Sequence, residues 1–220
     1  MIDVYFVDVN VADDVLEALA NLLTIPERAR ADRYRFSDDR RRSIVARAAT
    51  RRFIGRYLGT DPATLIIDEE EFGKPVLRGR AIEFNASHSG DLVALAFAKE
   101  TAVGIDVECR RPLNDTLALA RRFFSDAEVA IVEQATDVAD AFFTIWTAKE
   151  AIVKASGKGI GSGDLRGFTV PFRDPVLRPV IGGWSVAAVD PNRDGYYAAV
   201  AARDGKRQIT LQSISAAALI

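Results

Sequence analysis

"AIEFNASHSGDLVALAFAKETAVGIDVE", residues 81–108, contains three consecutive predicted strands around which the rest of the fold is arranged. Its apolar runs are short, and turn residues separate them, which is typical of buried β-strands rather than helices. The first two strands flank a turn at residues 89–91, and the third covers residues 102–108. Toward the N-terminus, "TLIIDEEEFGKPVL" (residues 64–77) indicates two strands joined by a turn at Gly73, and "IDVYFVDV" (residues 2–9) indicates a first strand.

Helices are predicted on both sides of this strand-rich stretch. A capping-box pattern, Thr24 followed by Glu27, predicts a short helix, and residues 37–58 predict a longer one that Ser37 caps and Gly59 ends. On the C-terminal side, a helix is expected at residues 113–125. A second capping box, Ser125 followed by Glu128, predicts the start of another helix, and a third is expected at residues 139–156.

The last sixty residues favour a mainly antiparallel sheet. Four short apolar runs indicate its strands, at residues 168–172, 183–189, 196–202 and 209–214. Because helices and strands occur in mixed order, we expect an α+β fold, with a boundary between two parts of the chain near residues 100–112.

Composition excludes several classes of protein. The chain has 220 residues, 49% of them hydrophobic and 27% charged, which is typical of a folded globular protein. Its one cysteine, Cys109, excludes an internal disulfide, and its one histidine excludes zinc sites built from several His and Cys ligands. Any metal must therefore be held by oxygen. The N-terminus resembles no signal peptide and no apolar run could span a bilayer, so we expect a cytoplasmic protein with no membrane partner.

Arginine is concentrated in one part of a chain whose net charge is −2. Residues 28–56 hold eleven arginines and three aspartates, which indicates an anionic partner unless this is only a solvated helix face. Nucleic acid is a weak candidate because the chain is acidic overall and few aromatic residues are interleaved with the arginines.

Two acidic residues lie two apart in the predicted strand at residues 102–108. Asp106 and Glu108 therefore face the same side, and they repel unless a cation lies between them. A solvated strand face is the alternative. The strand is otherwise apolar, and Gly104 allows another group to approach closely, so we favour an oxygen-lined Mg²⁺ site.

The predicted helix at residues 139–156 carries a second group of candidate residues. Trp146, Glu150 and Lys154 share one helical face. A surface ion pair between Glu150 and Lys154 is the simpler explanation. Beside a metal site, however, Glu150 could complete the coordination and Lys154 could meet a phosphate.

His88, the single histidine, lies between Ser87 and Ser89. A Ser-His-Asp hydrolase is disfavoured, because neighbours in a strand point apart and no Gly-x-Ser-x-Gly elbow is present. Two roles for His88 remain open: a hydrogen-bonded structural residue, or a hydrogen-bond donor to an anionic ligand. Lys74, just after the Gly73 turn, could also reach an anion, or it could simply be solvated.

Four motifs together resemble the 4′-phosphopantetheinyl transferase family, in its larger, surfactin-synthetase-activating type. They are "FGKPVL", "FNASHSG", "VGIDVE" and "FFTIWTAKEAIVKASGKGI", and they occur in the family's order and spacing. The resemblance covers residues 24–160 well and the last sixty only by length and strand pattern. It implies a holo-acyl-carrier-protein synthase, an enzyme that transfers phosphopantetheine from coenzyme A to a serine of an apo acyl or peptidyl carrier protein and releases adenosine 3′,5′-bisphosphate.

The resemblance also implies residue roles. Asp106, Glu108 and Glu150 match the ligands of Mg²⁺, with Mn²⁺ as an alternative, and Lys154 matches a lysine that meets the transferring phosphate. Glu150 is the favoured base for the serine proton, with Glu108 or a metal-bound water as alternatives.

Coenzyme A is expected to contact residues of the first part of the chain. His88 and Ser87 match phosphate contacts, and Lys74, Arg28 and Arg30 match residues that hold the 3′-phosphate and adenine, although Arg33 could replace Arg30.

The family fold is a pseudodimer of two α/β halves with coenzyme A between them, so we expect a nucleotide-binding half at residues 1–105 and a metal-binding, catalytic half at residues 106–220, in a monomer. The segment after Glu108 resembles the carrier-docking region. There, Arg110 and Arg111 suit an acidic carrier helix. Three apolar residues could either contact the carrier or pack in the core: Leu113, Leu117 and Phe124. Another Mg²⁺-dependent phosphotransferase and a non-catalytic coenzyme A sensor remain as alternatives.

Overall fold

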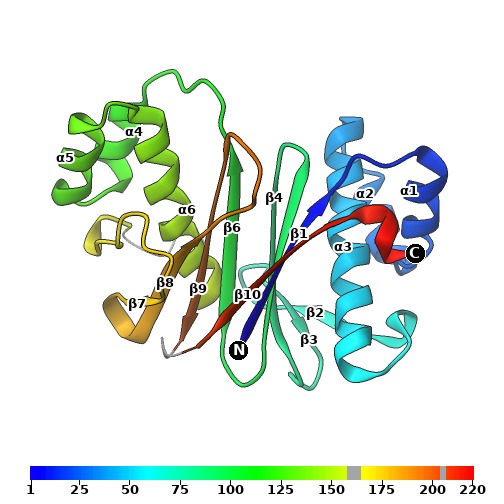
Figure 1. Ribbon diagram of the computed structural model, residues 1–220. Helices are drawn as coiled ribbons and strands as arrows, with labels where there is room; N and C mark the ends of the chain where they lie inside the picture. Colours follow the sequence, from blue (N-terminus) through cyan, green and yellow to red (C-terminus); the bar gives the residue numbers. More distant parts are fainter. Residues whose placement is uncertain (158–164, 204–206) are drawn as a thin grey trace.

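The computed structural model describes residues 1–157, 165–203 and 207–220. Within these ranges, strands and helices alternate irregularly along the chain, as expected for an α+β fold (Figure 1). In chain order the elements are β1 (Ile2–Asp8), α1 (Asp13–Ala20), α2 (Ile25–Ala31), α3 (Ser37–Leu58), η1 (Pro62–Thr64), β2 (Ile67–Glu69), β3 (Pro75–Leu77), β4 (Glu83–Ser89), β5 (Leu92–Ala98), β6 (Val103–Cys109), α4 (Thr116–Phe123), α5 (Asp126–Gln134), α6 (Val138–Ser156), η2 (Leu165–Gly167), β7 (Arg178–Pro179), η3 (Ile181–Gly183), β8 (Trp184–Val189), β9 (Tyr196–Arg203), β10 (Ile209–Ser215) and η4 (Ala216–Leu219).

Two four-stranded sheets form the middle of the molecule. One has the strand order β10-β1-β5-β4 and the other β6-β9-β8-β7, while β2 and β3 form a separate small hairpin. Figure 1 shows the helices in two groups on opposite outer sides, α1 to α3 beside the first sheet and α4 to α6 beside the second.

Three apolar cores correspond to this layered arrangement. The core between the sheets uses alternate residues of the central strands, such as Val4 of β1 and Ile105 of β6. The second core joins the first sheet to α1 and α3 through residues such as Phe53 and Phe97, and the third joins the second sheet to α4 to α6. Because each sheet is buried on both faces, its central strands read as nearly continuous apolar runs in the sequence.

Several local predictions are confirmed. The Thr24 N–H donates to Glu27 Oε2 at 2.8 Å, and the Ser125 N–H donates to Glu128 Oε2 at 2.8 Å, so both capping boxes are present. Helices α3 and α6 end at Gly59 and Gly157, both in the left-handed conformation that glycine adopts without strain. The strands of the quoted stretch are β4, β5 and β6, and Gly90 turns the chain between the first two with φ 53°.

Other predictions are wrong. Helix α3 begins at Ser37 itself, after Phe36, and no side chain caps it. The run at residues 168–172 forms no strand. The edge strand of the second sheet opposite β6 is the two-residue β7. Helix α1 was not predicted.

The last strand, β10, also lies where the sequence did not place it. It leaves the C-terminal strands and pairs in parallel with β1, as the red and blue strands in Figure 1 show. The expected boundary between residues 105 and 106 falls inside β6. The two sheets are therefore not formed by two consecutive parts of the chain that meet at residue 105.

Gly104 brings α6 directly onto β6. A Cβ at Gly104 would lie 2.2 Å from the Ala151 carbonyl oxygen and 2.3 Å from the Ala155 nitrogen, both in the α6 backbone. Since these are backbone atoms, no side-chain rotation can make room. The close group that Gly104 admits is thus a helix, and this approach places α6 beside the acidic end of β6.

Gly104→Ala is expected to lower the free energy of unfolding by about 3 kcal/mol, because α6 must move away from β6. Chemical denaturation by urea measures this loss. Gly79→Ala is the matched control: a Cβ there meets nothing within 4 Å, and its φ of 85° should cost only about 1 kcal/mol of backbone strain. Equal losses in the two variants would contradict the role given to Gly104.

Candidate active site

The two sheets meet along β4 and β6, an edge strand of each. Side chains bridge these two strands: Asn85 Oδ1 accepts from the Ile105 N–H at 2.9 Å, and Ser89 Oγ accepts from the Cys109 N–H at 3.0 Å. We call this contact, formed by residues 85–89 and 105–109, the seam. It aligns polar residues of the first sheet with the acidic residues of the second.

The two serines beside His88 face the two acidic residues across the seam. Ser87 Oγ donates to Asp106 Oδ1 at 2.8 Å, and Ser89 Oγ donates to Glu108 Oε2 at 2.9 Å. Arg111 Nη1 also reaches Glu108 Oε2, at 3.2 Å. Both carboxylates are therefore held from the β4 side.

Helix α6 supplies the remaining charged groups. Lys154 Nζ donates to Asp106 Oδ1 at 2.6 Å and to Ser87 Oγ at 2.8 Å. Glu150, one turn earlier, is only 3% exposed. Explaining Glu150 and Lys154 as a surface ion pair is therefore wrong, because Lys154 is paired with Asp106 and Glu150 is buried. Five of the residues predicted from the sequence thus come together at the seam: Ser87, Asp106, Glu108, Glu150 and Lys154.

Two buried carboxylate oxygens at the seam lack a partner in the described part of the chain. They are Asp106 Oδ2 and Glu150 Oε1. Burial, together with the negative charges of Asp106 and Glu108, raises the pKa of Glu150 to about 7 even though Lys154 opposes the shift. Unsatisfied buried carboxylate oxygens with mutual repulsion are what a bound divalent cation would satisfy, so these residues fit Mg²⁺ chemically.

The predicted ligands do not, however, form a preassembled metal cluster in this conformation. Among residues 1–157, 165–203 and 207–220, no three His, Cys, Asp or Glu side chains are grouped so that they could hold one ion. Asp106 Oδ1 and Glu108 Oε2 instead accept hydrogen bonds from serine, lysine and arginine.

His88 points to the opposite side of β4 from the two serines. It lines a cavity of about 240 Å³ between α2, α3 and the β2–β3 hairpin. Burial, followed by the positive charges of Lys154 and Arg42, lowers the pKa of His88, although part of the ring stays exposed. A neutral imidazole still offers one N–H to a ligand in this cavity.

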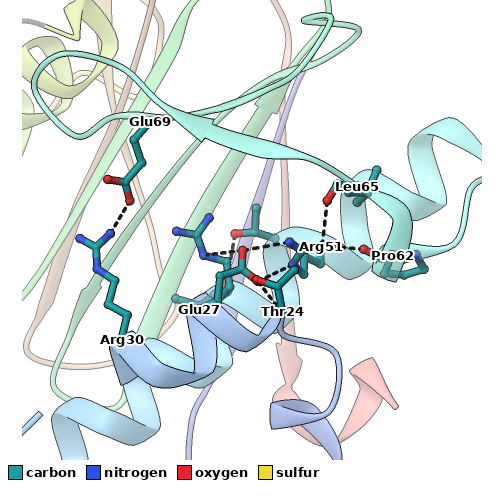
Figure 2. Close-up of polar contacts among 10 residues, drawn as sticks. Thr24, Glu27, Arg30, Arg51, Pro62, Leu65 and Glu69 are labelled. Carbon is teal, nitrogen blue, oxygen red and sulfur yellow. Dashed lines mark hydrogen bonds and ion pairs between the residues drawn. The ribbon is translucent and has the colours of Figure 1, made fainter. Parts of the chain in front are cut away.

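Arginines from two helices converge on the same cavity, which we call the arginine cavity. Arg30 of α2 and Arg47 of α3 line it. Figure 2 shows Arg30 reaching Glu69, and Glu27 held by Arg51. Arg51 binds Glu27 through Nε and Nη2, at 2.8 and 3.0 Å. The Arg47 Nε lies farther from Glu27, at 3.5 Å from its Oε1.

Arg47 was missed in the sequence, and Arg28 lies elsewhere. Arg28 bonds Glu17 and Asn21 of the α1 region and does not line the arginine cavity. Arg47 lines that cavity with Ser43 and Thr50, four residues before it and three after it. The spacing places these three residues on one face of α3, and this was the signal available in the sequence. Because the region contains many arginines, the sequence did not show which face of α3 lines a cavity.

Lys74 lies in an adjoining cavity of about 330 Å³, which Glu150 and Lys154 also line. Its Nζ donates to the Ala155 carbonyl at 2.9 Å and the Val103 carbonyl at 3.3 Å, and burial lowers its pKa. The two cavities share Gly73, Pro75 and Ala86 as lining residues, so the arginine cavity lies next to the cavity beside the seam.

The segment after Glu108 is only partly exposed. Arg110 makes a bidentate ion pair with Asp137, with N–O distances of 2.6 and 3.0 Å. Phe124 is fully buried and stacks on Phe142 with a centroid distance of 5.1 Å, so of its two predicted roles it has the one in the core. Leu113 and Leu117 are partly buried against the same core.

Comparisons with known proteins agree on one family. A family model described as the 4′-phosphopantetheinyl transferase superfamily matches residues 102–203, and one described as 4′-phosphopantetheinyl transferase, N-terminal, matches residues 11–100. The 4′-phosphopantetheinyl transferase HetI of a Nostoc species is 36% identical over 192 residues, which cover 84% of this chain and 81% of HetI. The Bacillus pumilus transferase psf-1 is 38% identical over 70% of this chain and 66% of its own length, and the Bacillus subtilis transferase Sfp is 28% identical over 70% and 69%.

The raised pKa of Glu150 predicts a pH-dependent stability without added metal. A carboxyl whose folded pKa, about 7, exceeds its usual 4.5 stabilises the fold below about pH 4.5 and loses that contribution as the pH rises through 7. Glu150→Gln should therefore unfold like the unmodified protein near pH 5 but be more stable by about 1 to 2 kcal/mol near pH 8.

Thermal unfolding in EDTA at both pH values measures this difference, which corresponds to a few degrees in Tm. Glu133→Gln, in an exposed ion pair with Arg121, is the control and should change stability by about 0.5 kcal/mol or less. A Glu150→Gln effect that is the same at pH 5 and pH 8 would show that Glu150 does not titrate in this range.

Proposed function

Because the chain belongs to the 4′-phosphopantetheinyl transferase superfamily, we propose that it transfers the 4′-phosphopantetheine group of coenzyme A to a serine of an apo acyl or peptidyl carrier protein. The observation that carries the proposal is the seam itself. It gathers two buried carboxylates with unsatisfied oxygens and a lysine beside two neighbouring cavities. A nucleotide-linked pyrophosphate requires this combination of acceptors for a cation and donors for phosphate.

Asp106, Glu108 and Glu150 would hold Mg²⁺. The two oxygens without partners, Asp106 Oδ2 and Glu150 Oε1, support this assignment. When bound, the ion supplies positive charge that neutralises the pyrophosphate oxygens during the transfer.

The reaction exchanges one phosphorus–oxygen bond for another. The carrier serine oxygen attacks the β-phosphorus of coenzyme A, the bond from that phosphorus to the bridging oxygen breaks, and adenosine 3′,5′-bisphosphate leaves. We assign the serine proton to Glu150, the base that the family resemblance favours; its pKa of about 7 belongs to the protein without a cation, and a bound Mg²⁺ would lower it. Glu108 is a weaker candidate because Ser89 and Arg111 already occupy its Oε2 atom.

Lys154 lies where it can serve the phosphates. Its ammonium lines the cavity that adjoins the seam, within hydrogen-bond distance of Asp106 and Ser87. A point charge at this position favours the extra negative charge on the departing oxygen. Lys74 lines the same cavity and is the second lysine available to the phosphates.

We assign the nucleotide end of coenzyme A to the arginine cavity. Arg30, Arg47 and His88 line it, and its two guanidinium groups are paired with two carboxylates, Glu69 and Glu27. Guanidinium groups bind phosphate with two parallel hydrogen bonds, so Arg30 and Arg47 suit a 3′-phosphate that displaces these carboxylates. Arg28 remains a prediction from the family resemblance, and it would have to leave Glu17 to reach the ligand.

The wider arrangement follows the family. We propose a pseudodimer in which residues 1–105 bind the nucleotide and residues 106–220 hold the metal, with β10 returning to complete the first sheet. We also propose that the chain works as a cytoplasmic monomer. Among the described residues, every helix is too short or too polar to cross a bilayer. Arg110 and Arg111, at the exposed start of the segment after β6, would face an acidic carrier helix.

Transfer can be tested by incubating the protein with coenzyme A, Mg²⁺ and an apo carrier, and measuring the carrier's intact mass. We expect the carrier to gain one phosphopantetheine, and we expect EDTA or Asp106→Asn to reduce the rate at least about 100-fold, because a charged ligand to the cation is lost. Asp68→Asn, an exposed residue paired with Arg78, should keep the normal rate. Tight binding of coenzyme A without mass gain on several unrelated carriers would favour a sensor instead.

Arg47→Gln tests the nucleotide site. Loss of a charge-assisted contact to the 3′-phosphate is expected to raise KM for coenzyme A by about 10- to 100-fold and to leave KM for dephospho-coenzyme A nearly unchanged. Arg40→Gln, on the same helix but paired with Asp32 outside the arginine cavity, is the control. An equal rise in KM for both substrates would place the 3′-phosphate elsewhere.

A further inference from the structure

The turn between β4 and β5 consists of Gly90 and Asp91, and its backbone is held by residues far away in the sequence. The Gly90 carbonyl accepts a hydrogen bond from Arg42 Nη1 of α3 at 2.9 Å. The Asp91 carbonyl accepts from the Val9 N–H, just after β1, at 3.0 Å. Both partners belong to the same half of the chain as the turn, so these two contacts fix the turn to its own sheet and helix.

Two residues of the other half also hold the turn. The Asp91 N–H donates to Tyr196 Oη at 2.8 Å, and Tyr196 is the first residue of β9 in the second sheet. Arg193, in the segment before β9, has its Nη2 atom 3.3 Å from Asp91 Oδ2 and its Nη1 atom 3.0 Å from Asp8 Oδ2. Its guanidinium carbon lies over the Tyr196 ring, 5.4 Å from the centroid. The turn that follows His88 is therefore held by side chains of both halves.

The turn also lies directly against the strand ends of the second sheet. Gly90 has a φ of 53°, and a Cβ at this position would clash with the Tyr196 hydroxyl oxygen and would lie 3.0 Å from Cys109 Cβ. Cys109, the last residue of β6, is the register partner of Tyr196 in β9. The Tyr196 hydroxyl both touches Gly90 and bonds the Asp91 N–H, so it sets how closely the turn approaches the second sheet.

The position of His88 depends on this turn. Only Ser89 separates His88 from Gly90, so a shift of the turn also shifts the imidazole, which lines the arginine cavity. Hydrogen bonds from an N–H donor form over a narrow range of distances, about 2.7 to 3.2 Å, so a small shift is enough to weaken a contact to a bound phosphate. Tyr196 itself lines neither the arginine cavity nor the cavity beside the seam. Its effect on a ligand there is therefore expected to pass through the turn.

We propose that Tyr196 is a positioning residue for nucleotide binding: its hydroxyl, carried by the second sheet, holds the β4–β5 turn so that His88 can donate to the nucleotide in the arginine cavity. The inference rests on the proposed function, because it takes this cavity as the site of the nucleotide end of coenzyme A. It goes beyond that function because it makes nucleotide binding in one half of the chain depend on a side chain of the other half. Tyr196 lies outside the four motifs that resemble the family.

The test measures nucleotide binding by the full-length protein. Adenosine 3′,5′-bisphosphate titrated in EDTA by calorimetry gives the nucleotide Kd. Tyr196→Phe removes only the hydroxyl that the Asp91 N–H uses, so it should raise this Kd by about 3- to 10-fold, the loss typical of one hydrogen bond. Tyr5→Phe is the matched control: it removes a hydroxyl that bonds Tyr57 in the nucleotide half itself, outside the arginine cavity, and it should leave the Kd within about twofold.

A double-mutant cycle shows whether Tyr196 acts through His88. His88→Ala removes the imidazole and should itself weaken nucleotide binding. If the turn matters because it places this imidazole, adding Tyr196→Phe to His88→Ala should change the Kd by less than about twofold further. Thermal unfolding of every variant separates a loss of stability, which Tyr5→Phe should share, from a loss of affinity, which it should not.

Two results overturn the inference: a nucleotide Kd that Tyr196→Phe leaves unchanged, or an effect of Tyr196→Phe that is undiminished in the His88→Ala protein. If the unmodified protein transfers phosphopantetheine, either result rejects the inference alone. If nucleotide binding depends on Tyr196 and His88 as expected but no carrier is modified, the inference stands and the proposed function fails. Absence of nucleotide binding in the unmodified protein would reject the inference together with the nucleotide site that it assumes.

Discussion

The contact between β4 and β6 brings together the charged side chains of the candidate active site. Both are edge strands, and exposed strand edges usually pair with another strand through their backbones. Here side chains bridge the edges: Asn85 and Ser89 bond backbone N–H groups, and Ser87 and Ser89 bond carboxylates. The two sheets therefore stay separate, and their junction can hold polar groups within an otherwise apolar interior.

Close backbone packing on the other side of β6 completes the site. Because Gly104 has no side chain, α6 lies directly on the strand, and its residues Glu150 and Lys154 lie beside Asp106. A larger residue in place of Gly104 would push α6 away from β6, and the charges of Glu150 and Lys154 would then lie farther from the seam. The same glycine thus allows both the close packing of α6 and the position of these charges.

Concentrating charge at this junction has an electrostatic cost. Asp106 and Glu150 each leave one buried oxygen unsatisfied, and the pKa of Glu150 rises to about 7. A fold selected only for stability would place apolar residues here. Such unsatisfied carboxylates are characteristic of sites where a ligand supplies the missing charge, and they occur where the two sheets meet, beside the cavity that Glu150 and Lys154 line.

The sequence by itself determined the local features of the protein. Short apolar runs separated by turn residues identified β4, β5 and β6, and capping boxes located α2 and α5. The two-residue spacing placed Asp106 and Glu108 on one face. These signals depend only on neighbours along the chain. The family was also recognisable from its motifs. Only the tertiary structure decided that β10 returns to pair with β1, that Arg47 rather than Arg28 enters the arginine cavity, and that Ser87 bonds Asp106. These outcomes depend on contacts between residues far apart in sequence, and a hydroxyl's partner is set by whichever group the folded chain brings within about 3 Å of it.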